Sequence, residues 1–243
     1  MSKLHIIQPM GGGGTRFAKQ GFKMPKPLID LAGKPFFYWS TASLYDYIEN
    51  KDLTFVVLKD HVERFNIKSR IYDYYPNANV VVIPDILNGA VLTALKGVEG
   101  IGDNNPIIIN DCDHAFRCKA FENFVNNNLN NDVDGALLTF ESDDSKYSFL
   151  KMDENGNVIQ TVEKKVVSTH AICGAYYFKN ASTFKIYADR YLNNCNYNEF
   201  FMSGVYNEMA KDNLNIKNFT CDYHIPFGTP DEYEAAKQQE IFK

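Results

Sequence analysis

The feature that most constrains this chain is a run of glycines that directly follows an apolar segment near its N-terminus. Residues 4–8 are apolar enough for a buried strand, and four glycines at 11–14 lead into Thr15 and Arg16. Glycines let backbone N–H groups curve around an anion without intervening side chains. A helix beginning near Thr15 would point its positive N-terminal end at the same anion. The pattern predicts a phosphate-binding loop, to which Arg16 and Lys26 add positive charge.

Two familiar phosphate-binding loops do not fit this segment. A P-loop closes with Gly-Lys-Ser/Thr, whereas this chain has Thr15-Arg16. The dinucleotide fingerprint that would start at Gly12 and Gly14 requires a third glycine where the chain has Phe17. Both classes of nucleotide-binding protein are therefore excluded.

Length, composition and charge narrow the class of protein further. The chain has 243 residues, 45% of them hydrophobic and 23% charged, which fits one ordinary globular α/β domain. A net charge of −5 offers no basic surface for nucleic acid, and no apolar run is long enough to span a bilayer. Five scattered cysteines and the absence of a signal-like N-terminus favour a reducing compartment. We expect a cytoplasmic protein with neither nucleic-acid nor membrane partners.

Apolar runs alternate with helical patterns through the first half, which predicts βαβ units around a parallel sheet. The second half begins with a hairpin at 148–152 and 158–164 around Asn155-Gly156. We expect a single domain over residues 1–243 with an α/β fold of three layers and a mostly parallel central sheet. The other predicted strands are 4–8, 54–58, 80–83, 106–110, 135–140 and 172–178, and the predicted helices are 35–48, 61–74, 88–98, 116–127, 182–193, 200–211 and 231–241.

Two carboxylates follow the predicted strand at 106–110, in the segment Asp111-Cys112-Asp113-His114. Ligands of open parallel sheets lie at the carboxyl ends of the strands, so these side chains should face the glycine loop. Alternate carboxylates at a strand end suit a hard cation such as Mg²⁺. The other interpretation is that one aspartate caps a helix beginning near Ala115. His114 is expected to make local hydrogen bonds.

The segment Pro9-Met10-Gly11-Gly12-Gly13-Gly14-Thr15-Arg16-Phe17, followed by Pro25-Lys26-Pro27-Leu28, resembles the signature of sugar-1-phosphate nucleotidylyltransferases. The resemblance is closest to a bacterial branch of capsule type and extends over almost the whole chain. It implies a Rossmann-like nucleotidyltransferase fold and transfer of NMP from an NTP to a phosphorylated acceptor, with release of pyrophosphate. Residues 1–115 would bind mainly nucleotide and residues 140–230 mainly acceptor.

The same resemblance assigns roles to individual residues. It implies Mg²⁺ as cofactor, with Asp113 as the metal ligand and Asp111 as a less certain one, because the family more often has Asn there. Val162-Glu163-Lys164 and the nearby Gly174-x-Tyr176 would line the acceptor side. The implied catalytic residues are Arg16, Lys26 and Asp113; the nucleotide-binding residues are Met10, Gly11, Gly12, Gly13, Gly14, Thr15, Asn88 and Gly89; the acceptor-binding residues are Glu163, Lys164, Gly174, Asn198 and Glu199.

One departure from the family pattern concerns the second metal ligand. Many members carry an aspartate two residues before a Gly-Thr-Pro segment, where this chain has Pro226. The missing ligand would be water and phosphate, or one of three other carboxylates: Asp111, Glu199 or Asp222.

Several questions stay open at this level. A glycosyltransferase that uses Asp111-Cys112-Asp113 as an Asp-x-Asp motif, and a protein that binds nucleotide without turnover, are the alternatives. Backbone contacts from Asn88-Gly89-Ala90 to the base favour CTP or UTP over GTP. A sugar phosphate used for surface polysaccharide synthesis is the favoured acceptor, and a homo-oligomer is not excluded.

Overall fold

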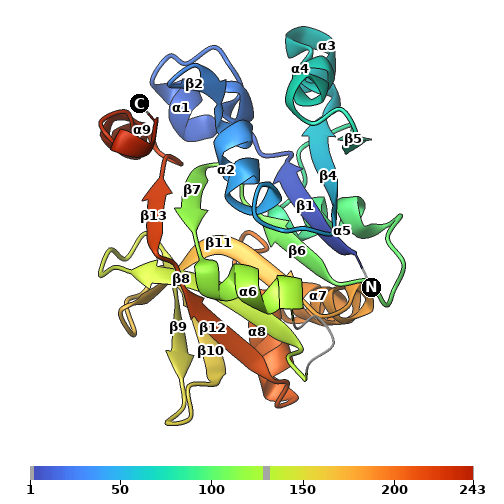
Figure 1. Ribbon diagram of the computed structural model, residues 1–243, viewed down its shortest axis with the longest axis vertical. Coiled ribbons are helices and arrows are strands. Elements are labelled where there is room, and N and C mark those ends of the chain that lie inside the picture. Colours follow the sequence, from blue (N-terminus) through green and yellow to red (C-terminus); the bar gives the residue numbers. More distant parts are fainter. Residues whose placement is uncertain (1–2, 128–131, 243) are drawn as a thin grey trace.

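The computed structural model describes residues 3–127 and 132–242. Within these residues, nine strands form one sheet with helices on both faces (Figure 1). The path through the sheet is β10 (Val158–Glu163), β9 (Ser148–Met152), β11 (His170–Phe178), β6 (Ile107–Asn110), β1 (Leu4–Met10), β4 (Lys51–Leu58) and β5 (Asn79–Ile83). Beside this path, β8 (Gly135–Glu141) pairs with β11 and with β12 (Ile216–Thr220).

Two small ladders and the helices complete the described chain. The strand β13 (Tyr223–Pro226) pairs with β7 (His114–Arg117), and β2 (Asp30–Leu31) pairs with β3 (Lys34–Pro35). The helices are α1 (Thr15–Lys19), α2 (Phe36–Tyr45), α3 (Lys59–Phe65), α4 (Ile67–Tyr74), α5 (Ala90–Val98), α6 (Lys119–Asn127), α7 (Ala181–Asn194), α8 (Met202–Lys211) and α9 (Pro230–Ala236), with 3₁₀ turns at Lys26–Leu28 and Glu240–Phe242. None of the helices in the described ranges is long and apolar enough to cross a membrane.

Strand direction brings the predicted ligand-binding segments to one edge of the sheet. The strands β1, β4, β5 and β6 run parallel, so the glycine run after β1 and the aspartates after β6 leave the sheet at the same end. The antiparallel strand β11 lies next to β6, with Ala175 opposite Asn110. The Asp111 N–H therefore donates to the Gly174 carbonyl at 2.9 Å.

Alternate residues of the central strands face two separate apolar layers, as period-two side-chain direction requires. On one side, Ile7 and Val56 pack in a cluster with residues of α5, α7 and α8. On the other side, Ile6 and Phe55 pack in a cluster with residues of α2, α4 and α6. The predicted three-layer α/β fold is confirmed.

Gly97 marks the closest approach of α5 to the sheet, which makes it a test of this packing. A Cβ at this position would lie 2.6 Å from Ile7 Cγ2 and 2.9 Å from Val56 Cγ2. We expect Gly97→Ala to lower the free energy of unfolding in urea by about 1–3 kcal/mol, because overpacking outweighs the helix propensity of alanine. The matched control is Gly100→Ala, whose Cβ would meet open space. Equal unfolding midpoints for the two variants would contradict the close approach.

Several predicted elements have different bounds in the structure, and the short strands β2, β3, β7, β12 and β13 were not predicted. The predicted helix at 61–74 is wrong as one element, because Asn66 has a left-handed backbone (φ 51°) and separates α3 from α4. The predicted helix at 116–127 begins only at Lys119, because the preceding residues form β7 against β13. The terminal helix ends at Ala236 rather than 241. Of the missed strands, β7, β12 and β13 are short and pair with strands distant in sequence.

Candidate active site

The glycine run forms one wall of a cavity of about 380 Å³ at the carboxyl end of β1. Gly14 has a left-handed backbone (φ 57°), and a Cβ there would lie 3.2 Å from Lys26 Cβ, so the turn requires glycine. We call this space the nucleotide cavity. It is lined by Met10, Gly11, Gly12, Gly13, Arg16, Lys26, Gly89, Ala90, Asp111, Asp113 and Glu199, among others.

Lys26 reaches across this cavity to the aspartate after β6. Its Nζ lies 2.7 Å from Asp113 Oδ2, and about a quarter of each side chain is exposed. Burial lowers the pKa of Lys26, but the Asp113 carboxylate together with the other acidic groups nearby raises it to above its ordinary value. Burial raises the pKa of Asp113, but the Lys26 ammonium together with His114 and Arg16 brings it below its ordinary value. Both groups are therefore charged at neutral pH.

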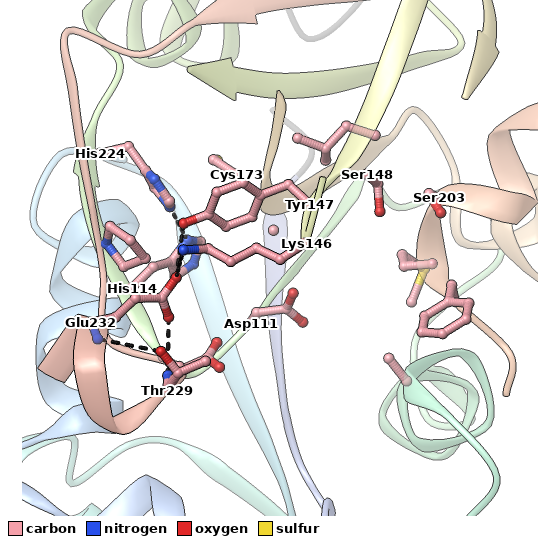
Figure 2. Close-up of a pocket in the computed structure, with 18 of the residues that line it drawn as sticks. Asp111, His114, Lys146, Tyr147, Ser148, Cys173, Ser203, His224, Thr229 and Glu232 are labelled. Atoms are coloured by element: carbon pink, nitrogen blue, oxygen red, sulfur yellow. Dashed lines mark hydrogen bonds and ion pairs between the residues drawn. The ribbon is translucent and has the colours of Figure 1, made fainter. Parts of the chain in front are cut away.

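A second cavity, of about 490 Å³, adjoins the first and is shown in Figure 2. We call it the acceptor cavity because the predicted acceptor residues Glu163 and Gly174 line it. Four residues line both cavities: Arg16, Ala90, Asp111 and Asp113. The side chains at the junction of the two cavities thus include the guanidinium of Arg16 and the carboxylates of Asp111 and Asp113.

Asp111 lies against β11, in the middle of the view in Figure 2. A Cβ at Gly174 would lie 2.7 Å from Asp111 Oδ2, and Gly174 has φ 94°, so a side chain at this position would collide with the carboxylate. Burial, together with the negative charge of Asp113, raises the pKa of Asp111 to about 6. Two neighbouring carboxylates in a buried site repel one another, which a bound cation would relieve.

Glu163 is held by hydroxyls from two different elements. Its Oε2 accepts a hydrogen bond from Ser203 Oγ at 3.0 Å and another from Ser148 Oγ. Ser148 begins β9 and Ser203 lies in α8, so the carboxylate is oriented within the acceptor cavity by tertiary contacts.

The capping interpretation of the aspartates is wrong. Residues 114–117 form a strand rather than a helix, so neither Asp111 nor Asp113 has a helix N-terminus to cap. His114 makes the expected local hydrogen bonds, with Nε2 3.0 Å from Asn110 Oδ1 and Nδ1 3.3 Å from His224 Nε2.

Some predicted site residues lie elsewhere than expected. Glu199, expected at the acceptor, lines the nucleotide cavity instead, because the backbone of Phe200 packs against Gly89. Asp222 lies at the opposite end of β13 from Pro226, where it accepts from the Lys119 N–H at 2.8 Å, so it is not a candidate metal ligand. The predicted residues that line neither cavity are Gly14, Thr15, Asn88, Lys164 and Asn198.

Other residues at the acceptor cavity were missed from the sequence. Lys146 and Tyr147 precede β9, His224 lies in β13, and Glu232 lies in α9. Only Glu232 had a sequence signal, since Thr229 and Glu232 have the spacing of a capping box, which the structure forms.

The comparisons with known proteins agree with this geometry. Residues 9–240 match the nucleotidyl transferase family. A 2-C-methyl-D-erythritol 4-phosphate cytidylyltransferase of Fusobacterium nucleatum is 26% identical over 163 residues, and the match spans 65% of each chain, just under two thirds of that relative. A solved nucleoside-diphosphate-sugar pyrophosphorylase from Vibrio cholerae has a TM-score of 0.83 at 24% identity, covering 96% of this chain and 100% of that one. An inositol-1-phosphate CTP transferase from T. maritima has a TM-score of 0.75 at 12% identity, covering 98% and 96%.

The Rossmann-like fold and the family match over most of the chain define an enzyme that transfers nucleotidyl groups. The chain belongs to the nucleotidyl transferase family.

Proposed function

We propose that this enzyme transfers NMP from an NTP to the phosphate of a small acceptor and releases pyrophosphate. The observation that carries the proposal is the junction of the two cavities at Arg16, Asp111 and Asp113. A nucleotide bound along the glycine run and an acceptor bound beside Glu163 would meet at this junction. Such a meeting point is what in-line transfer between two phosphates requires.

In this proposal the nucleotide cavity holds the triphosphate. The glycines at 11–13 present a surface without side chains to the β- and γ-phosphates. The positive charge of Arg16 offsets the negative charge of the departing pyrophosphate. Lys26 steadies the α-phosphate and the attacking oxygen. Its pairing with Asp113 keeps its ammonium at the junction, where the transferred group would lie.

The acceptor cavity suits a small molecule that carries hydroxyl groups as well as phosphate. The Glu163 carboxylate lies among hydroxyl donors and can accept further hydrogen bonds from an acceptor hydroxyl. A sugar phosphate or another polyol phosphate satisfies this requirement.

The residues at the junction fit a divalent cation such as Mg²⁺. Asp111 and Asp113 supply the carboxylate oxygens that Mg²⁺ prefers, and the repulsion between them favours a cation. No group of three or more His, Cys, Asp or Glu side chains that could hold a metal occurs in the described ranges, so phosphate and water would complete the shell. A bound Mg²⁺ would neutralise phosphate charge as a Lewis acid.

The reaction needs no general base from the protein. An acceptor phosphate monoester is already ionised at neutral pH, and its oxygen attacks the α-phosphorus while the bond to the β-phosphate oxygen breaks. The products are an NDP-acceptor and pyrophosphate. The chain's own groups align the two phosphates and offset charge through Arg16 and Lys26.

We propose CTP or UTP as the nucleotide. The relatives named as a cytidylyltransferase and a CTP transferase support this choice. From the N-terminal resemblance we also propose surface polysaccharide synthesis as the pathway, and from the five scattered cysteines we propose the cytoplasm as the location.

The experiment is a matrix of the four common NTPs against phosphorylated acceptors, with pyrophosphate release as the readout. We expect release only when both substrates and Mg²⁺ are present, with CTP or UTP giving the largest kcat/KM. Release of free nucleoside diphosphate from a nucleotide sugar would instead indicate the glycosyltransferase alternative. Nucleotide binding without turnover across the whole matrix would indicate the non-catalytic alternative.

A further inference from the structure

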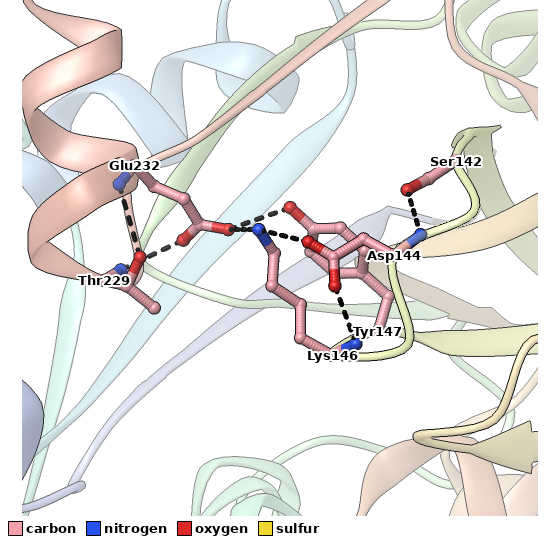
Figure 3. Close-up of polar contacts among 6 residues, drawn as sticks. All are labelled: Ser142, Asp144, Lys146, Tyr147, Thr229 and Glu232. Carbon is pink, nitrogen blue, oxygen red and sulfur yellow. Dashed lines mark hydrogen bonds and ion pairs between the residues drawn. The ribbon is translucent and has the colours of Figure 1, made fainter.

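A mostly buried carboxylate joins two distant segments at the wall of the acceptor cavity (Figure 3). Glu232 Oε1 accepts from the Tyr147 hydroxyl at 2.8 Å and lies 3.0 Å from Lys146 Nζ. Its Oε2 accepts from the Thr229 N–H at 3.0 Å, and only 11% of the side chain is exposed. Residues 142–147, between β8 and β9, are called the acceptor loop below. Glu232 fastens this loop to the start of α9.

The helix that carries Glu232 is itself anchored on the nucleotide half. The next residue, Tyr233, packs edge-on against Phe17, at 6.3 Å between ring centroids, and in a tilted arrangement against Phe36, at 5.5 Å. Its hydroxyl donates to the Asp30 carbonyl at 2.9 Å. These partners precede β4 in the chain, so α9 is a fixed part of the nucleotide side.

The turn that enters α9 also touches the catalytic carboxylate. The Phe227 N–H donates to the Asp113 carbonyl at 2.9 Å. A Cβ at Gly228 would lie 2.5 Å from Asp113 Oδ2, which leaves no room for a side chain. The short segment from Phe227 to Glu232 thus contacts both Asp113 and the acceptor loop.

Lys146 is already neutralised by protein groups, which argues against its binding an anionic substrate. Its Nζ lies 2.9 Å from Asp144 Oδ2, in addition to its contact with Glu232. Burial and the hydrogen bond to Glu232 raise the pKa of Tyr147, so its hydroxyl stays protonated and donates. Figure 3 shows Lys146 between the two carboxylates. The cluster therefore holds the loop in place.

We propose that Glu232 is a positioning residue that sets the place of the acceptor relative to Asp113. It does so by docking the acceptor loop, through Lys146 and Tyr147, on the segment that contacts Asp113. The inference rests on the proposed function, because it concerns the acceptor of that reaction. None of these three side chains contacts the reacting atoms in this account.

The experiment measures KM for each substrate and kcat in Glu232→Gln and Tyr147→Phe. Glu232→Gln removes the ion pair with Lys146, and Tyr147→Phe removes the hydrogen bond to the Glu232 carboxylate. Both changes keep the shape of the side chain. We expect the acceptor KM to rise about tenfold and kcat to fall, while the KM for NTP stays within about twofold of wild type. The matched control is Glu234→Gln, on the same helix, which loses only an exposed ion pair with Lys237.

The double variant separates positioning from general stability. If Tyr147 and Glu232 act as one unit, the double variant should be no worse than the more affected single variant. If the increases in acceptor KM of the two single variants multiply in the double variant, the inference is wrong. A lower melting temperature of the single variants with an unchanged acceptor KM would overturn it as well. Lys146→Met, which leaves the capping box intact, gives the same test if Glu232→Gln does not fold. A wild-type enzyme with no pyrophosphate release would instead refute the proposed function.

Discussion

Lys26→Ala should lower kcat by about 10²–10³-fold, which corresponds to about 3–4 kcal/mol of transition-state stabilisation. The physical reason is the loss of the ammonium that the structure places against Asp113, at the junction of the two cavities. The prolines on either side restrict the backbone and aim this side chain. Pyrophosphate release under saturating substrates is the measurement, and circular dichroism checks the fold.

The control for this variant is Lys19→Ala, at the exposed end of α1, which should leave kcat unchanged. The fold should survive the loss of Lys26, because both members of the pair keep partial contact with solvent. A Lys26→Ala enzyme with a nearly normal rate would remove this residue from the mechanism.

Asp113→Asn should reduce activity to background, whereas Asp111→Asn should only weaken it. Asp113 is paired with Lys26 and contacts the turn at Gly228, and its replacement removes the carboxylate proposed to hold the metal. An asparagine at 111 keeps an oxygen donor and removes the repulsion that raises the pKa of Asp111. Activity is measured at several Mg²⁺ and Mn²⁺ concentrations, with EDTA as the metal-free reference.

The comparison of these two variants also decides the nature of the metal site. Equal losses would mean that both carboxylates are required, so that the chain needs no third carboxylate at the place of Pro226. Full activity in EDTA would refute the metal proposal. The Gly97 and Gly100 alanine variants provide a reference for stability changes unrelated to the site.

The position of the glycine run beside a cavity could be predicted because its determinants are local. The strand at the N-terminus, the glycines and Arg16 lie within one short stretch, and their residue types dictate a turn that can approach phosphate. The aspartates after β6 follow from a general property of parallel sheets, whose strand ends share one edge. The alternation of Ile6 and Ile7 between two apolar layers follows from strand periodicity.

The acceptor side could not be predicted in the same way, because it depends on pairings between distant segments. The register of β11 against β6 places Gly174 against Asp111. The ladder of β7 with β13 places the first residues of the expected helix at 116–127 in a strand and brings Pro226 beside His114. No local pattern encodes such a register.

The sequence by itself determined the fold class and the place of the glycine loop at the end of the first strand, since residue propensities and the general rules of parallel sheets suffice for both. Only the tertiary structure decided which side chains face the acceptor. Glu199 lines the nucleotide cavity because the neighbouring Phe200 backbone packs against Gly89. Asp222 lies away from both cavities because it binds the N–H of Lys119 at the start of α6. Glu232 lines the acceptor cavity because its helix, α9, packs on Phe17 and Phe36 through Tyr233. Long-range packing fixes these positions, because the contacts that hold them join residues up to about two hundred positions apart, as between Tyr233 and Asp30.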